Sequence, residues 1–196
     1  EWLPPEEFKD LSSYDEIAID LETKDPNLKT MGSGSVTGQA KIVGVALAVE
    51  GWSAYYPIAH EGGGNMDRKK VMDYFRTILN YPSKKIFHNA MYDVCFIRAE
   101  GLKINGTIID TMIAGSLVDE NRFRYDLGSM GRDYVGRGKN EAVLLETAKE
   151  WGIDPKSEMY KLPAMYVGEY AEQDAKLTLE LWQEMKKEIV HQDIES

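Results

Sequence analysis

Residues 17–23 read Ile17-Ala18-Ile19-Asp20-Leu21-Glu22-Thr23, an apolar run that takes up acidic residues at alternate positions toward its end. This alternation predicts a β-strand over 17–22. Because side chains two residues apart point to the same face of a strand, Asp20 and Glu22 would lie side by side. Two adjacent carboxylates on a buried strand need a counter-charge, whereas on a solvent-facing strand edge they need none. The pair therefore predicts either a cation site or an exposed edge.

Two further acidic residues lie beside apolar runs elsewhere in the chain. Asp93 begins an apolar helical stretch, and by itself it would be an aspartate favoured by the dipole of a helix N-terminus. Tyr170 and Asp174 are four residues apart on a predicted helix, so they share one face, and by themselves they would be an ordinary surface pair. Four carboxylates that converge in one fold repel one another unless cations neutralise them. Oxygen atoms are the ligands that Mg²⁺ and Mn²⁺ prefer, so the set indicates a metal-dependent phosphodiesterase.

The composition of the chain bounds its class. It has 196 residues, 43% hydrophobic and 29% charged, as expected for one soluble globular domain with a full core. The net charge of −10 argues against a basic nucleic-acid-binding surface, although two divalent cations would neutralise the four candidate ligands. No apolar run approaches the roughly 20 residues of a membrane span, and Glu1–Pro5 has no signal-peptide pattern. Cys95, the single cysteine, is expected to be a buried small hydrophobic residue.

The remaining chain predicts a mixed sheet flanked by helices, of the α/β class. Strands are expected over 17–22, 41–49, 53–58, 85–87 and 107–110. Helices are expected over 67–79, 91–100, 111–118, 126–135, 141–151 and from about 164 to 190. The second and third strands would form an antiparallel hairpin that turns at Glu50-Gly51. Proline and several glycines over 24–40 predict a long loop.

Taken together, the three acidic segments resemble the three motifs of the DEDD superfamily of 3′→5′ exonucleases. Asp20-Leu21-Glu22 is similar to the first motif, and His88-Asn89 through Asp93 is similar to the second. The third motif has a tyrosine form and a histidine form. Tyr170-x-x-x-Asp174 is similar to the tyrosine form, since Glu169 stands where the other form has histidine.

Within the tyrosine form, the chain is most similar to the proofreading domains of family-A DNA polymerases, especially phage-type ones. The similarity rests on Tyr170–Trp182 and on Asp110-Thr111-Met112 followed by Tyr125-Asp126-Leu127, and it covers about residues 15–188. It implies a ribonuclease-H-like fold with a mixed five-stranded sheet flanked by helices. It also implies a single exonuclease domain over 1–196, with its core at about 15–190.

The resemblance implies a role for each site residue. The carboxylates that would hold two Mg²⁺ or Mn²⁺ ions, and serve in catalysis, are Asp20, Glu22, Asp93 and Asp174. Tyr170 would complete the catalytic set and orient the attacking water together with Glu22. The residues expected to contact the substrate are Leu21, Thr23, Asn89 and Tyr92. For Asn89, a simple turn-forming role stays open.

The expected reaction releases 5′-mononucleotides from single-stranded or mismatched DNA 3′ ends. The protein is expected to be a monomer of the cytoplasm, or of the host cytoplasm if a phage encodes it, and a polymerase domain C-terminal to this chain stays open. Two alternatives remain. One is a free-standing RNA exonuclease of the ribonuclease-D type, which shares the tyrosine motif. The other is an inactive ribonuclease-H-like scaffold that only binds.

Several other residues are expected to be structural. Asp110 lies where a strand meets a helix, so an N-cap role is favoured over a ligand role. His60 and His88 are also expected to be structural, because Mg²⁺ prefers oxygen. The aromatic residues expected in the core or lining the site are Tyr92, Phe96, Trp151 and Trp182.

Overall fold

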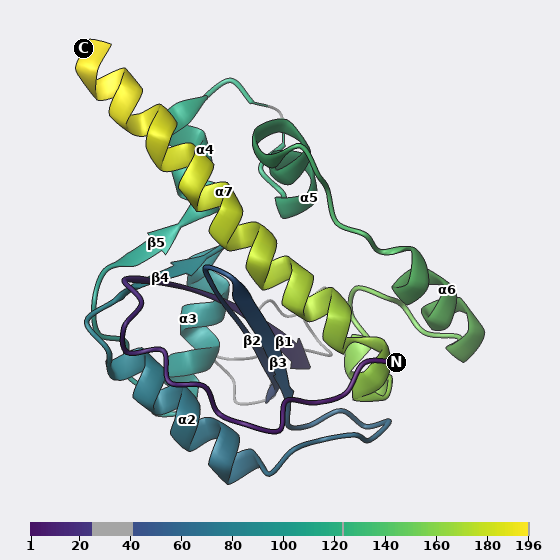
Figure 1. The fold of residues 1–196 in the computed structure, drawn as a ribbon. Helices are drawn as coiled ribbons and strands as arrows, with labels where there is room; N and C mark the ends of the chain where they lie inside the picture. The colour runs from purple at the N-terminus through teal and green to yellow at the C-terminus, as the bar shows by residue number, and fades with distance from the viewer. Residues whose placement is uncertain (25–40, 123, 196) are drawn as a thin grey trace.

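The computed structural model describes residues 1–24, 41–122 and 124–195, which are built around a five-stranded sheet (Figure 1). The strands are β1 (Glu16–Lys24), β2 (Lys41–Val49), β3 (Trp52–Pro57), β4 (Lys84–Phe87) and β5 (Ile108–Asp110). Their order across the sheet is β3-β2-β1-β4-β5. Strand β2 is antiparallel to β1 and β3, whereas β4 is parallel to β1 and β5. The predicted mixed sheet and hairpin are confirmed, and β1 lies at the centre.

Helices cover both faces of this sheet. They are α2 (Arg68–Asn80), α3 (Ala90–Ala99), α4 (Thr111–Val118), α5 (Leu127–Met130), α6 (Ala142–Trp151) and α7 (Gly168–Glu195). Three short helical turns are η1 (Gly131–Val135), η2 (Met159–Lys161) and η3 (Ala164–Tyr166). Figure 1 shows α7 crossing one face of the sheet, with α2 and α3 on the other. None of the described helices is long and apolar enough to cross a membrane.

Two predicted helices differ from the structure in type or in starting residue, and one predicted loop lies almost entirely outside the described residues. The helix expected over 126–135 is one α-helical turn followed by the π-helical turn η1. The last helix begins at Gly168 rather than near 164, because residues after Pro163 close the separate 3₁₀ turn η3 first. The loop expected over 24–40 lies outside the described residues, except that Lys24 is the last residue of β1.

The two faces of β1 contribute to two different cores. Ile17, Ile19 and Leu21 are buried in a cluster that includes Phe75 of α2 and Phe96 of α3. Ala18, which points the opposite way, is buried in the cluster beneath α7. Because side chains alternate along a strand, Asp20 and Glu22 share the face of Ala18 and point toward α7.

The contact between α7 and the sheet is made largely of alanine. The fully buried alanines that meet there are Ala18, Ala46, Ala48, Ala171 and Ala175. Because small methyl groups occupy this part of the contact, the helix and the sheet pack closely there. This packing brings Asp174, which precedes Ala175, over the face of β1 that carries Asp20 and Glu22.

The first residues of the chain lie against the beginning of α7. The indole of Trp2 fills the space beside Gly168, where an added Cβ would lie 2.1 Å from the ring. The Nε1 atom of Trp2 donates a hydrogen bond of 3.0 Å to Glu172, which also accepts one of 3.2 Å from the backbone N–H of Tyr55. The first turn of α7 is therefore held by both the N-terminal segment and β3.

Two burial predictions were wrong. Trp151 is 49% exposed, because it is the last residue of α6, which buries only a short stripe of side chains. Cys95 is partly exposed rather than buried. The other three were confirmed. Phe96 lies in the core, and Tyr92 packs against the same cluster. The partly buried Trp182 packs against the cluster beneath α7 and donates a hydrogen bond of 2.7 Å from Nε1 to Glu16.

Candidate active site

Three of the four predicted carboxylates converge where β1 meets α7. One carboxylate oxygen from each of Asp20, Glu22 and Asp174 lies within 4.8 Å of the others. The two-residue spacing on β1 places the first pair on one face, and the alanine contact brings Asp174 across to them. The separation suits a cation bound between the three residues.

Asp93 lies beside this group rather than within it. It is in the first turn of α3 and is buried, and its carboxylate accepts a hydrogen bond from the backbone N–H of Leu21. Its charge interacts with both Asp20 and Glu22. The structure therefore places all four predicted carboxylates in one region. Three of them lie close together, and the fourth, Asp93, is hydrogen-bonded to Leu21, which lies between Asp20 and Glu22 on β1.

Burial and mutual repulsion make these carboxylates unusually weak acids. Burial first, and then the charge of Asp174, raise the pKa of Asp20 to about 8. Burial also raises the pKa of Asp174 to about 6, and the pKa values of Glu22 and Asp93 lie well above their ordinary range. Such groups hold protons unless a positive charge is bound among them. An all-oxygen, negatively charged donor set of this kind fits a hard divalent cation.

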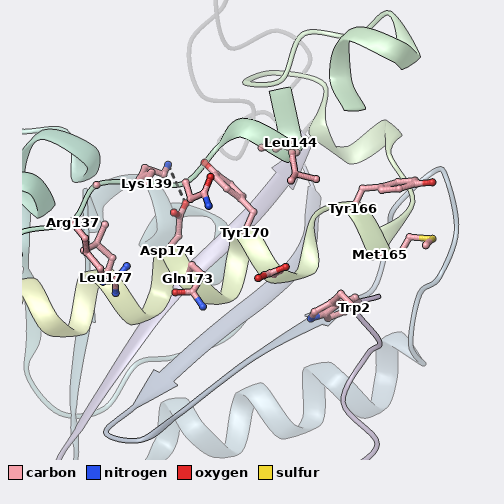
Figure 2. A pocket seen from close by; sticks show the side chains of 14 residues that line it. Trp2, Arg137, Lys139, Leu144, Met165, Tyr166, Tyr170, Gln173, Asp174 and Leu177 are labelled. Atoms are coloured by element: carbon pink, nitrogen blue, oxygen red, sulfur yellow. Dashed lines mark ion pairs between the residues drawn. The ribbon is translucent and has the colours of Figure 1, made fainter. Parts of the chain in front are cut away.

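Tyr170 and Lys139 border the cluster on its α7 side. Tyr170 interacts with the side chain of Asp174, and burial raises the pKa of its phenol, so the hydroxyl stays protonated. The ammonium of Lys139 lies 3.1 Å from Oδ2 of Asp174 and 4.8 Å from the centre of the Tyr170 ring. Figure 2 shows the three side chains pointing toward one another, with the ion pair drawn as a dashed line.

The carboxylates open onto a cavity of about 370 Å³. Leu21, Thr23 and Tyr92, three of the four residues predicted to contact a substrate, line it together with the acidic group. The hydroxyls of Thr23 and Tyr92 are 2.8 Å apart. Asn89 is not among the lining residues. It precedes α3 with a left-handed backbone, at φ 69°, and its side chain makes no capping hydrogen bond.

A second cavity, of about 430 Å³, shares Lys139, Leu144, Tyr170 and Asp174 with the first. Its lining is drawn in Figure 2. Trp2, Arg137, Tyr166 and Gln173 are among the residues that line it. These four shared residues therefore face both cavities.

The residues expected to be structural have structural partners. Asp110 accepts hydrogen bonds of 2.9–3.0 Å from the backbone N–H groups of Asn89, Ala90 and Met112, so it caps α4 as predicted and also binds the start of α3. His60 contacts Tyr55 and the carbonyl of Leu162, and burial lowers its pKa to about 4.

His88 contacts the hydroxyl of Thr111 and the carbonyl of Tyr125, each at 2.7 Å. Burial lowers its pKa as well. Both histidines thus serve packing, as predicted, and neither is directed at the carboxylates.

Lys139 is the site residue that the sequence analysis missed. It lies in Gly136-Arg137-Gly138-Lys139-Asn140, a segment between η1 and α6 without helical or strand periodicity. The one available signal is that the basic residues Arg137 and Lys139 each follow a glycine, a pattern that also fits an ordinary surface turn. Nothing local in the sequence indicates that its partner is Asp174, 35 positions later.

Comparison with known proteins gives one family and several related polymerases. Residues 4–190 match the family described as 3′-5′ exonuclease. The DNA-directed DNA polymerase of Pseudomonas phage M6 is 34% identical over 99% of this chain, which covers 30% of that polymerase. This chain thus spans less than a third of that relative's length.

Solved structures show the same ribonuclease-H-like fold. RNase D of Trypanosoma brucei superposes with a TM-score of 0.65 at 18% identity, over 89% of this chain and 58% of that one. Brucella melitensis NrnC with bound Mg²⁺ superposes with a TM-score of 0.62 at 17% identity, over 94% of this chain and 78% of that one. At these identities the likeness concerns the fold.

Proposed function

Because this chain belongs to the 3′–5′ exonuclease family of family-A DNA polymerases, we propose that it removes nucleotides from single-stranded or mismatched DNA 3′ ends and proofreads for a polymerase. The observation that carries this proposal is the convergence of Asp20, Glu22 and Asp174 within 4.8 Å at the wall of an open cavity. Asp93 and Tyr170 border the same group. Side chains from β1, α3 and α7 therefore meet at one point, which the 3′ end of a DNA strand would reach through the cavity.

The donor set supports two divalent cations, Mg²⁺ or Mn²⁺, as the cofactor. Asp20, Glu22 and Asp174 would hold one ion, and Asp20 would hold the other with Asp93 nearby. Bound there, the ions would lower the pKa of the attacking water and neutralise the charge that develops on the leaving 3′ oxygen. Raised carboxylate pKa values support the assignment, because they show that the cluster lacks sufficient positive charge of its own.

Tyr170 would orient the attacking water. Its phenol stays protonated beside Asp174 and Glu22, so it offers both a hydrogen-bond donor and an acceptor at the acidic group. Glu22 faces the same point and would share this role. A water held between the two would be directed at the phosphorus atom, which is the positioning that in-line displacement requires. This role supports the tyrosine form of the superfamily for this chain.

The relatives support DNA as the substrate. The phage M6 protein is a DNA-directed DNA polymerase, and this chain matches 30% of its length, so the site would serve a primer terminus made by a polymerase domain. The similarity to RNase D keeps RNA as the second candidate, but it extends only to the fold.

Digestion of DNA and RNA strands of one sequence, each labelled at the 5′ end, tests the proposal. With Mg²⁺ or Mn²⁺ we expect the DNA to shorten one nucleotide at a time from its 3′ end, faster than the RNA, and no reaction in EDTA. Faster cleavage of RNA would favour the ribonuclease reading. If Mn²⁺ neither supports cleavage nor raises the melting temperature, the chain is a scaffold, since a ligand of the native state must stabilise it.

A further inference from the structure

Lys139 is the only basic residue among the described residues that forms an ion pair with one of the four site carboxylates. Its side chain is 22% exposed, and its ammonium lies against both Asp174 and the ring of Tyr170. The charge of Lys139 also acts on Asp20 and Glu22. One positive charge therefore acts on three of the four acidic groups.

The backbone that carries Lys139 is held in place. Arg137 binds Glu180 of α7 through Nε at 3.2 Å and Nη2 at 2.9 Å. The carbonyl of Gly131 accepts the N–H of Gly136 at 2.9 Å, and Gly136 has a left-handed φ of 85° that favours glycine. A Cβ on Gly138 would lie 3.0 Å from the side chain of Arg132. The segment is thus fixed to α7, and Lys139 is directed at the site rather than at solvent.

The partner of Lys139 depends on what else binds Asp174. In the protein without metal, the ammonium compensates the charge of that carboxylate. When the carboxylates hold divalent cations, the charge of Asp174 is shared with them, and the cations repel a nearby ammonium. Lys139 lines the cavity that the substrate would enter, where the remaining anion is the phosphate that is cut.

We propose that Lys139 is a catalytic residue with two partners, Asp174 in the metal-free protein and an oxygen of the scissile phosphate in the loaded one. This inference rests on the proposed exonuclease function. As a compact cation with three donors, an ammonium can turn from one oxygen to another without moving its backbone. Lys139 would stabilise the negative charge that the phosphate gains during in-line attack.

The test compares Lys139→Met and Lys139→Arg with the charge-matched control Lys149→Met, an exposed substitution on α6. Calorimetric titration with Mn²⁺ alone should show binding roughly two- to fivefold tighter in Lys139→Met than in wild type, the factor that loss of a competing ion pair predicts. Titration with thymidine 5′-monophosphate at saturating Mn²⁺ should show binding about tenfold weaker. Lys139→Arg should retain most of the nucleotide affinity, and Lys149→Met should match wild type in both titrations.

Single-turnover cleavage at saturating Mn²⁺ and DNA completes the test. We expect Lys139→Met to lower the rate constant by roughly 10- to 100-fold, with Lys139→Arg closer to wild type. Unchanged nucleotide affinity and an unchanged rate constant in Lys139→Met would overturn the proposal and leave Lys139 a counter-ion only. That outcome differs from failure of the exonuclease function itself, in which wild type would not cleave either.

Discussion

The carboxylate of Asp93 accepts a hydrogen bond from the backbone N–H of Leu21, the residue that separates Asp20 from Glu22. This hydrogen bond links helix α3 to β1 at the centre of the acidic group. The bond gives Asp93 a structural role in addition to its proposed role near the metals. The two roles can be separated by substitution, because an amide oxygen still accepts from Leu21 but carries no charge.

We expect Asp93→Asn to keep the fold while lowering Mn²⁺ affinity and activity. The amide preserves the bond to Leu21 and removes a buried charge whose pKa is raised, so the melting temperature in EDTA should stay equal or rise. Asp93→Ala should lose activity and stability together, since the Leu21 N–H loses its partner. Calorimetry with and without Mn²⁺ checks both variants. Equal Mn²⁺ affinity in wild type and Asp93→Asn would remove Asp93 from the ligand set.

Asp20→Ala and Asp174→Ala should both reduce exonuclease activity by at least roughly 100- to 1,000-fold, as expected when a main electrostatic contact is lost. Their effects on stability without metal should differ. Removing Asp20 relieves repulsion, so its melting temperature in EDTA should equal or exceed that of wild type. Removing Asp174 also leaves Lys139 without its ion-pair partner, so the gain should be smaller. Near wild-type cleavage by either variant would show that the site is assigned wrongly.

The contribution of the site carboxylates to the stability of the metal-free protein should fall as the pH rises from about 4 to 8. Asp20 and Asp174 have pKa values raised from 3.8 to about 8 and about 6. Their stabilising contribution is complete below the unfolded pKa of 3.8 and is lost as the pH passes through the folded values, because the folded protein binds more protons over this range.

Melting temperatures in EDTA at several pH values measure this effect. Asp20→Asn should show a shallower decline than wild type, and Mn²⁺ should raise the melting temperature most at high pH, where the carboxylates have released their protons. The same pH dependence in Asp20→Asn and wild type in EDTA would contradict the raised pKa of Asp20.

Tyr170→Phe should slow cleavage by roughly 10- to 100-fold without weakening Mn²⁺ binding. The ring would still fill its place beside Lys139, and only the hydroxyl that orients water would be lost. Parallel rate measurements and Mn²⁺ titration separate the two effects. An unchanged rate would mean that Glu22 alone positions the water.

Single-stranded and mismatched DNA 3′ ends should be cut faster than matched duplex. The chain carries a net charge of −10, so it offers little electrostatic attraction to a duplex, and a paired end must melt before it reaches the carboxylates. Each base-pair step that melts costs about 1.4 kcal/mol on average. Digestion of the three substrates side by side at low salt is the measurement. Equal rates on duplex and single strand would refute proofreading while leaving the nuclease assignment intact.

Much of the fold could be predicted because its signals are local. The alternation over residues 17–22 marks β1 and places Asp20 and Glu22 on one face, and the turn at Glu50-Gly51 marks the hairpin. The four-residue spacing of Tyr170 and Asp174 likewise holds on any helix. These features follow from backbone geometry, so the sequence alone reveals them.

The rest depends on contacts between distant segments. Lys139 reaches Asp174 from a segment that Arg137 ties to α7 through Glu180. Trp2 reaches Glu172 across 170 positions of sequence. The exposure of Trp151 also depends on the absence of a neighbour rather than on its own apolar character.

The alanine contact beneath α7 has a consequence for the choice of metal. Ala18 of β1 and Ala175 of α7 are buried in the cluster that joins the helix to the sheet, close in sequence to Asp20, Glu22 and Asp174. A larger side chain there, as in Ala175→Val, would lift the helix, since a packed core has no spare volume. The site would then be wider and better suited to a larger ion such as Ca²⁺ than to Mg²⁺. We therefore expect ion selectivity at this site to depend on residues that do not touch the ion.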